Sequence, residues 1–289
     1  MMIRQKTVRC VAGLSVAAIL ACGLSGCGKL VNGAHTVPTV KYRPDANAAA
    51  EPESTGAAAE AVADAGAGGI GNLKGKVLFD GNFAPLPNLF EKGGATKDPA
   101  VCGAEAIPNE SILVKDGGLA NVFIYLEKAP KGAKSADAES KVFFDQKTCI
   151  FLPHAMLVRT KQTVFVQNDD AAAHNTHTNP QKNSGFNSVV SPNDRVGVPL
   201  VYSQAEKQPL SVVCDIHAWM QAYHLPLDHS FAAISSADGT FEIKDLPAGK
   251  HEFKVWHEVG KMLEKSLIVT IKPGENEIKI NVAASKLGK

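Results

Sequence analysis

Residues 210–220 read LSVVCDIHAWM, and this stretch is the most informative in the chain. Its first four residues are apolar and rich in β-branched side chains, which predicts a short buried strand. Cys214 ends that strand, and His217 and Met220 follow it at the spacing C-x2-H-x2-M. A loop that leaves a strand at the cysteine can turn all three side chains toward one point. A thiolate, an imidazole and a thioether together suit copper, so the stretch predicts a metal site.

A second imidazole has to come from elsewhere in the chain, and His174 is the candidate because it follows the strand predicted at 163–167. Each residue has an ordinary interpretation when taken alone. Cys214 could belong to a disulfide, His217 could be a surface histidine, and Met220 could fill the core. The occurrence of all of them in this pattern favours the metal site. His154, His177 and the Trp-His-Glu stretch at 256–258 are interpreted as structural or rim residues.

These segments resemble the blue-copper cupredoxin family, which includes plastocyanin, pseudoazurin and amicyanin. The resemblance covers about residues 150–226 and rests on the His-Asn-x-His pattern at 174–177 and on the later C-x2-H-x2-M loop, both of which are amicyanin-like. It implies a Greek-key sandwich with one mononuclear type 1 copper ion. The ligands that it implies are His174, Cys214 and His217, with Met220 as the weak axial ligand. It also implies that Asn175 braces the two ligand loops and tunes the thiolate.

The C-terminal part of the chain carries a second resemblance. Residues 237–249 read ADGTFEIKDLPAG and are followed by alternating strands, which is similar to the carboxypeptidase-regulatory-like, or prealbumin-like, β-sandwich that also occurs beside rhamnogalacturonan lyase catalytic domains. LKGKV at 73–77 resembles the first strand of that module, and residues 121–126 resemble the second. The copper domain would then be inserted into this module or share strands with it.

The expected fold is therefore all-β, with a Greek-key cupredoxin-like sandwich combined with a prealbumin-like sandwich. Period-two alternation in the last sixty residues supports this class, and no long segment has helical periodicity. The expected bounds are 71–140 for the N-terminal strands of the regulatory-like sandwich, 141–228 for the copper domain, and 229–289 for the rest of the regulatory-like sandwich.

The N-terminus is expected to be a lipoprotein leader. A basic segment and a short apolar run end in Leu-Ser-Gly-Cys at 24–27, so residues 1–26 resemble a signal peptide and Cys27 the lipidated residue. Residues 27–70 are rich in Ala, Gly and Glu and are expected to be a disordered tether. These features predict anchoring in the cell envelope, facing the periplasm or the cell surface. Gly28 favours the outer membrane, because an aspartate at that position often signals retention at the inner membrane.

Six cysteines are present. Two leave with the leader and Cys27 carries the lipid, so three remain in an oxidising compartment. One of these three should be unpaired or bound to a metal. The simplest solution pairs Cys102 with Cys149 and leaves Cys214 free, although a disulfide from Cys214 to either of the others is the alternative.

The formal net charge is only +1, from 30 basic and 29 acidic residues, so nothing indicates nucleic-acid binding. The leading hypothesis is a membrane-tethered electron carrier with a transient redox protein as its partner. The alternative is a non-redox envelope protein that binds carbohydrate or stores copper. An enzyme is not expected, because the chain has no H-x-H pair of the multicopper kind and only one cysteine in the 214–220 loop.

Overall fold

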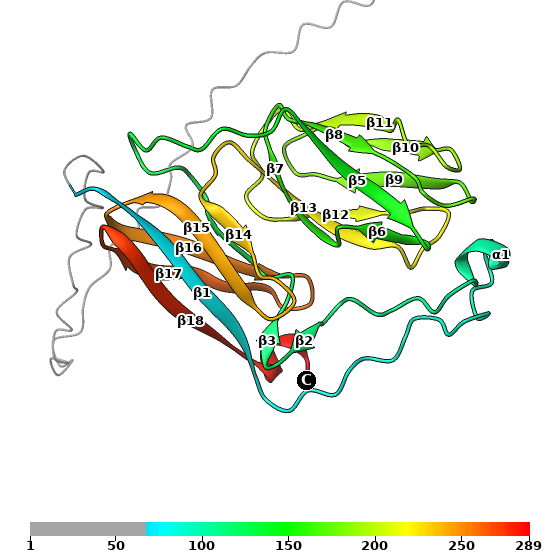
Figure 1. Ribbon diagram of the computed structural model, residues 1–289, viewed down its shortest axis with the longest axis horizontal. Coiled ribbons are helices and arrows are strands. Elements are labelled where there is room, and N and C mark those ends of the chain that lie inside the picture. The colour runs from blue at the N-terminus through cyan, green and yellow to red at the C-terminus, as the bar shows by residue number, and fades with distance from the viewer. Residues whose placement is uncertain (1–67) are drawn as a thin grey trace, which may run out of the picture. The chain divides into compact units, whose positions relative to one another are not determined.

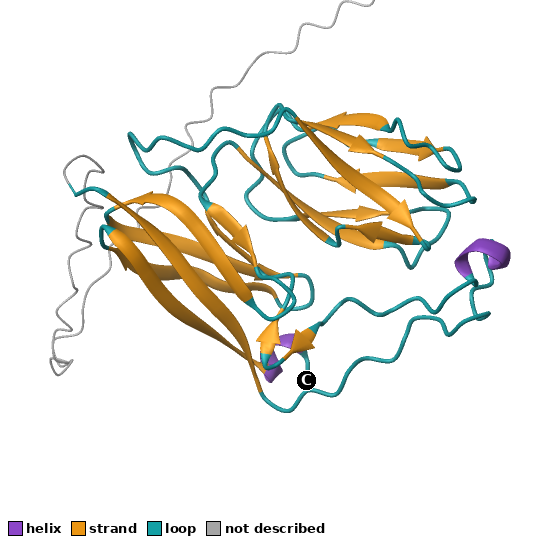
Figure 2. Cartoon of the chain, viewed as in Figure 1, coloured by secondary structure: helices purple, strands orange, loops and turns teal. Residues whose placement is uncertain are grey.

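The computed structural model describes residues 68–289, and this part of the chain is almost entirely β-structure. Its strands form four sheets, which are arranged as two sandwiches (Figures 1 and 2). The expected all-β class is confirmed. The predicted leader, the lipid site at Cys27 and nearly all of the predicted tether lie outside the described residues. Within 68–289, no helix has the length and apolar character needed to span a membrane.

The first sandwich combines strands from both ends of the described chain. Its first sheet contains β1 (Ile70–Asp80), β2 (Val114–Lys115), β3 (Gly118–Leu119), β15 (Thr240–Pro247) and β18 (Gly274–Ala283). Its second sheet contains β4 (Phe123–Leu126), β14 (Ala232–Ile234), β16 (Gly249–His257) and β17 (Lys261–Ile271). A short 3-10 helix, Ala284–Leu287, follows β18. The apolar faces of the two sheets enclose one core.

Strand β1 organises the first sheet. It pairs antiparallel with β15 and parallel with β18, so that Gly71–Asp80 lies in register with Gly274–Ala283. Leu73 and Val77 are fully buried in the core, in agreement with the alternation in the sequence.

Strand β4 has a different pattern, because all four of its residues are buried. Ile124 and Leu126 face the core of the first sandwich, whereas Phe123 and Tyr125 pack with Leu225 and other side chains of the second sandwich. A strand that is covered on both faces is a continuous apolar run rather than an alternating one. This accounts for the uninterrupted sequence FIYL.

The second sandwich is contiguous in sequence and lies between β4 and β14 along the chain (Figure 1). One sheet contains β7 (Ala155–Arg159), β9 (His174–Asn179), β10 (Asn187–Val190), β12 (Leu210–Val213) and β13 (Gln221–Leu227). The other contains β5 (Lys141–Lys147), β6 (Ile150–Leu152), β8 (Thr163–Val166) and β11 (Val198–Val201).

The segment between β1 and β2 differs from expectation. It was predicted to belong to the first sandwich, but its helix α1 (Pro99–Cys102) and its apolar residues Ala95 and Ile107 belong to the core of the second. Figure 1 shows this long excursion of the chain with α1 at its far end. We call residues 90–107 the arm. A disulfide between Cys102 and Cys149 joins the arm to the second sandwich.

Candidate metal centre

The site lies where β9 and β12 run side by side. The two strands are antiparallel, with Val213 opposite His177. Continuing the same register places Asn175 opposite Asp215, just beyond the end of β12. The start of β9, which carries His174 and Asn175, therefore lies beside the loop that begins at Cys214.

The loop 214–220 is closed by its own hydrogen bonds. The Met220 amide donates to the carbonyl oxygen of His217 at 2.9 Å, and the Cys214 amide donates to the carbonyl of Met220 at 3.3 Å. The backbone N–H of His217 also donates to the Cys214 sulfur at 3.3 Å. This tight turn brings the imidazole of His217 back toward the thiol that precedes it by three residues.

Three of the predicted ligands converge. The Nδ1 atoms of His174 and His217 are 2.9 Å apart, and the Cys214 sulfur is 3.9 Å from Nδ1 of His217. One ligand atom from each of the three residues lies within 4.8 Å of the others, and all three side chains are buried. Cys214 is a free thiol.

The donor set fits a single metal ion. Atoms bound to one ion at about 2.0–2.3 Å lie at most about 4.6 Å apart, and the distances of 2.9 and 3.9 Å are within that limit. Two imidazole nitrogens that face each other at 2.9 Å also require a cation between them or a proton on one of them, since two lone pairs would repel. Nitrogen and thiolate ligands in this combination suit copper.

Two aspartates that the sequence analysis did not identify fix the orientation of the imidazoles. Nε2 of His174 lies 2.8 Å from Oδ2 of Asp170, and Nε2 of His217 lies 2.9 Å from Oδ2 of Asp98. When each Nε2 carries the proton donated to its carboxylate, each Nδ1 is left to act as a ligand. Asp170 precedes His174 by four residues in a turn, which is a weak local signal, whereas Asp98 is 119 residues from His217.

Asn175 is hydrogen-bonded to the loop that begins at Cys214. Its Oδ1 accepts hydrogen bonds from the backbone N–H of Asp215 at 2.7 Å and of Ile216 at 3.3 Å, and it lies 3.3 Å from the Cys214 sulfur. Its Nδ2 donates to Oδ1 of Asn187 and to Oδ2 of Asp215, each at 2.8 Å. One buried amide thus connects β9, β10 and the ligand loop.

The electrostatics of the site favour a bound cation. Burial opposes ionisation of the Cys214 thiol, but hydrogen bonds from His174 and from backbone amides hold its pKa below the ordinary value. Burial also opposes protonation of His174, yet Asp170 and Cys214 raise its pKa to about 9. Burial and the charge of His174 lower the pKa of His217, against the effect of Asp98.

The remaining predicted residues are placed as follows. Met220 is buried in the same core as Cys214 and closes the loop through its backbone, and its role as axial ligand stays a prediction. His177 pairs with Asp215 at the rim, with 3.1 Å between Nδ1 and Oδ1. His154 lies outside the site, with Nε2 at 2.5 Å from Oε1 of Glu258.

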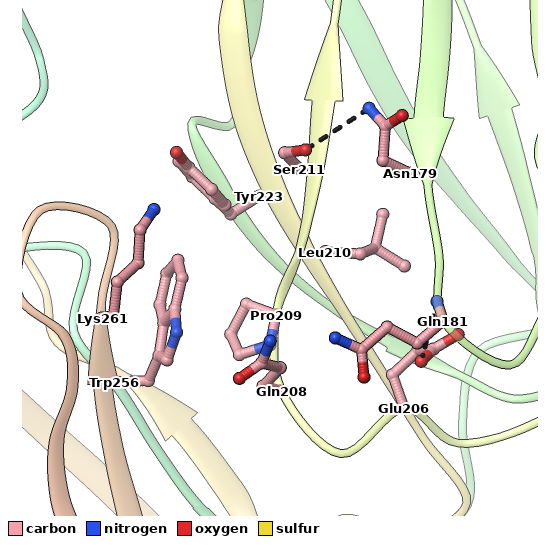
Figure 3. A pocket seen from close by; sticks show the side chains of 10 residues that line it. All are labelled: Asn179, Gln181, Glu206, Gln208, Pro209, Leu210, Ser211, Tyr223, Trp256 and Lys261. Atoms are coloured by element: carbon pink, nitrogen blue, oxygen red, sulfur yellow. Dashed lines mark hydrogen bonds between the residues drawn. The ribbon is translucent and has the colours of Figure 1, made fainter.

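A separate pocket lies beside β13 and β16 (Figure 3). Tyr223 and Trp256 line it with ring centroids 5.0 Å apart, and both side chains are almost completely buried. The Lys261 ammonium lies over both rings, at 5.6 Å from the Tyr223 centroid and 5.5 Å from the Trp256 centroid. The two rings are thus covered by neighbouring side chains, among them Lys261.

Comparison with known proteins gives partial similarities. No protein-family model matches the sequence, and no curated protein matches it. Among solved structures, a copper-containing nitrite reductase from Thermus scotoductus SA-01 is 15% identical over 35% of this chain, with a TM-score of 0.28, and the match spans only 25% of that enzyme.

Two further solved structures are matched over almost their whole length. A purple cupredoxin from Nitrosopumilus maritimus is 16% identical over 31% of this chain and 100% of its own, with a TM-score of 0.25. A reduced amicyanin variant is 15% identical over 36% of this chain and 98% of its own, with a TM-score of 0.27.

Proposed function

We propose that this protein is a mononuclear copper protein that transfers single electrons in the cell envelope. The observation that carries the proposal is the convergence of two imidazole nitrogens and one free thiol from His174, His217 and Cys214 at one buried point. Copper bound there would supply the one-electron redox change. Anchoring through a lipid on Cys27 is part of the proposal and rests on the leader-like sequence that ends at this residue.

The chain supports this role by holding its ligands in one arrangement. Asp170 and Asp98 restrain the two imidazoles, and Asn175 restrains the loop that carries the thiol. Because these hydrogen bonds restrain the ligand side chains, little rearrangement should accompany a change of charge at the site.

A carrier is favoured over an enzyme because the ligands are inaccessible. The side chains of His174 and His217 are 0% exposed and that of Cys214 is 1% exposed. Buried ligands leave no open path for a substrate to reach a bound metal, whereas electron transfer does not require the partner to touch the metal. Ala218 is exposed beside half-buried Trp219, so this surface is where we expect a redox partner to dock in a small, transient contact.

Copper reconstitution of the purified full-length protein tests the proposal. We expect an intense visible Cu(II)–thiolate band and a reversible one-electron wave in voltammetry. Cys214→Ser should abolish the band, and His174→Ala should abolish or strongly alter it. His177→Ala is the matched control, because His177 lies on the same strand but pairs with Asp215 at the rim, and it should keep the band.

Two outcomes would contradict the proposal. Cu(II) binding without a thiolate band would assign the metal to other ligands. A colourless protein that binds an oligosaccharide tightly would favour the alternative, a carbohydrate-binding envelope protein.

A further inference from the structure

Asp98 has a local conformation that its own helix does not explain. It precedes α1 with φ 45° and ψ 54°, in the left-handed region that a residue with a Cβ rarely adopts. An aspartate in this position ordinarily accepts a hydrogen bond from the first turn of the helix, but the Asp98 side chain makes no such cap. The Asp98 carbonyl oxygen accepts from the N–H groups of Val101 and Cys102, so the helix uses the backbone of Asp98 and leaves its carboxylate free for a partner elsewhere.

The carboxylate of Asp98 is directed to the metal centre instead. Its Oδ2 lies 2.9 Å from Nε2 of His217, a candidate ligand whose side chain is 0% exposed. Asp98 itself is 43% exposed, so it lies at the boundary between the imidazole and solvent.

Several contacts hold the arm in this place. The Cys102–Cys149 disulfide joins it covalently to the turn between β5 and β6. A β-bridge between Phe90 and Ile107 closes the base of the arm. The Phe90 ring packs against Trp219 of the ligand loop, with centroids 5.0 Å apart.

The same disulfide also reaches the support of the other imidazole. The backbone N–H groups of Thr148 and Cys149 donate to the Asp170 carboxylate at 2.7 and 2.8 Å, and Asp170 in turn holds Nε2 of His174. One covalent bond therefore connects the two structures that orient the two imidazoles.

We propose that Asp98 is a positioning residue of the metal site. It directs Nδ1 of His217 toward His174 and Cys214, and with the disulfide-tethered arm it limits how fast the metal enters and leaves. The proposal rests on the proposed function for the identity of the metal. The effect of Asp98 on the His217 tautomer does not depend on any metal.

The first test uses metal-free protein. Long-range ¹H–¹⁵N NMR of the histidine rings reports which nitrogen of His217 carries the proton. We expect the Nε2–H form in the wild type and loss of that preference in Asp98→Gly, which relieves the left-handed backbone and removes the carboxylate. Asp116→Gly is the matched control: Asp116 also has a positive φ, of 50°, but lies in the β2–β3 turn.

The second test measures the transfer of Cu(I) from the loaded protein to a chromogenic chelator. Transfer should be about tenfold faster or more in Asp98→Gly and in the Cys102→Ser/Cys149→Ser double variant, the usual size of effects from groups that orient a ligand. Asp98→Asn keeps an acceptor oxygen, so its rate of Cu(I) transfer should lie between the rate of the wild type and the rates of these two variants. Asp116→Gly should not differ from the wild type.

The proposal is overturned if Asp98→Gly keeps both the Nε2–H tautomer and the wild-type transfer rate. If the wild type shows no copper–thiolate band, the proposed function fails, and the tautomer measurement alone decides whether Asp98 positions His217. Circular dichroism and the chemical-shift spectrum identify any variant that has failed to fold. In that case the wild-type tautomer decides, and a proton on Nδ1 instead of Nε2 of His217 overturns the proposal.

Discussion

Replacing Asn175 by alanine should destabilise the metal-free protein strongly. The Asn175 side chain is 4% exposed, and its Oδ1 accepts from the backbone N–H groups of Asp215 and Ile216. Alanine leaves these two donors without that acceptor in a partly buried loop, and it also removes the donors to Asn187 and Asp215.

The size of the effect follows from these bonds. A buried donor that loses its partner costs about 1–3 kcal/mol, whereas a hydrogen bond near solvent contributes about 0.5–1.5 kcal/mol. The two amides are partly buried, so we expect a loss of about 3 kcal/mol in the free energy of unfolding. Urea unfolding followed by fluorescence should show a lower midpoint with an unchanged slope.

Asn179→Ala is the matched control for this measurement. Asn179 lies on the same strand, is exposed, and donates one long hydrogen bond of 3.4 Å to Ser211. Its loss should change the free energy of unfolding by less than about 0.5 kcal/mol. Equal effects of the two substitutions, or an effect of Asn175→Ala below about 1 kcal/mol, would refute the reasoning that Asn175 holds the loop.

Two further predictions concern the cores. Burial lowers the pKa of His224 from 6.5 to about 3. Between these pH values the folded chain therefore binds fewer protons at His224 than the unfolded chain does. The stability that comes from keeping His224 neutral is lost as the pH falls from 6.5 toward 3. The free energy of unfolding should therefore rise less steeply with pH in this window in His224→Leu than in the wild type, by up to about 1.4 kcal/mol per pH unit. Urea titrations at several pH values measure this slope, and an unchanged slope would contradict the prediction. Gly118→Ala should destabilise the first sandwich by about 3 kcal/mol, because its Cβ would lie 1.8 Å from the Asp238 carbonyl oxygen. Gly117→Ala is the control, because a Cβ there meets nothing within 4 Å although φ is +74°. It should lower the free energy of unfolding by only about 1 kcal/mol, measured by thermal unfolding. An equal loss of stability in the two variants would argue against the close contact at Gly118.

The parts of the site that were predictable share one property, which is that their signal is local. The C-x2-H-x2-M spacing is contained in one turn, and the His-Asn pair begins a single strand. Three cysteines remained after the predicted leader and lipid site, and the simplest pairing among them, Cys102 with Cys149, is the one in the structure. The strands near 73–79 and 210–213 were visible from their alternation or β-branched composition.

The parts that were missed depend on tertiary contacts. Asp98 precedes a proline at the start of a helix, which locally favours an ordinary cap, and only the folded chain brings it to His217. The arm was assigned to the first sandwich because it lies between β1 and β2, but its apolar residues pack in the second core. Neither fact has a periodic signal that sequence reasoning could detect.

The order of the strands along the chain has a consequence for folding. All strands of the second sandwich precede residue 228, whereas β1 pairs with β15 and β18, which lie at the C-terminal end of the chain. Domains generally fold as units. The metal-centre sandwich has all of its own strands in one continuous segment, so it can fold before the first sandwich, which has to bring the two ends of the described chain together.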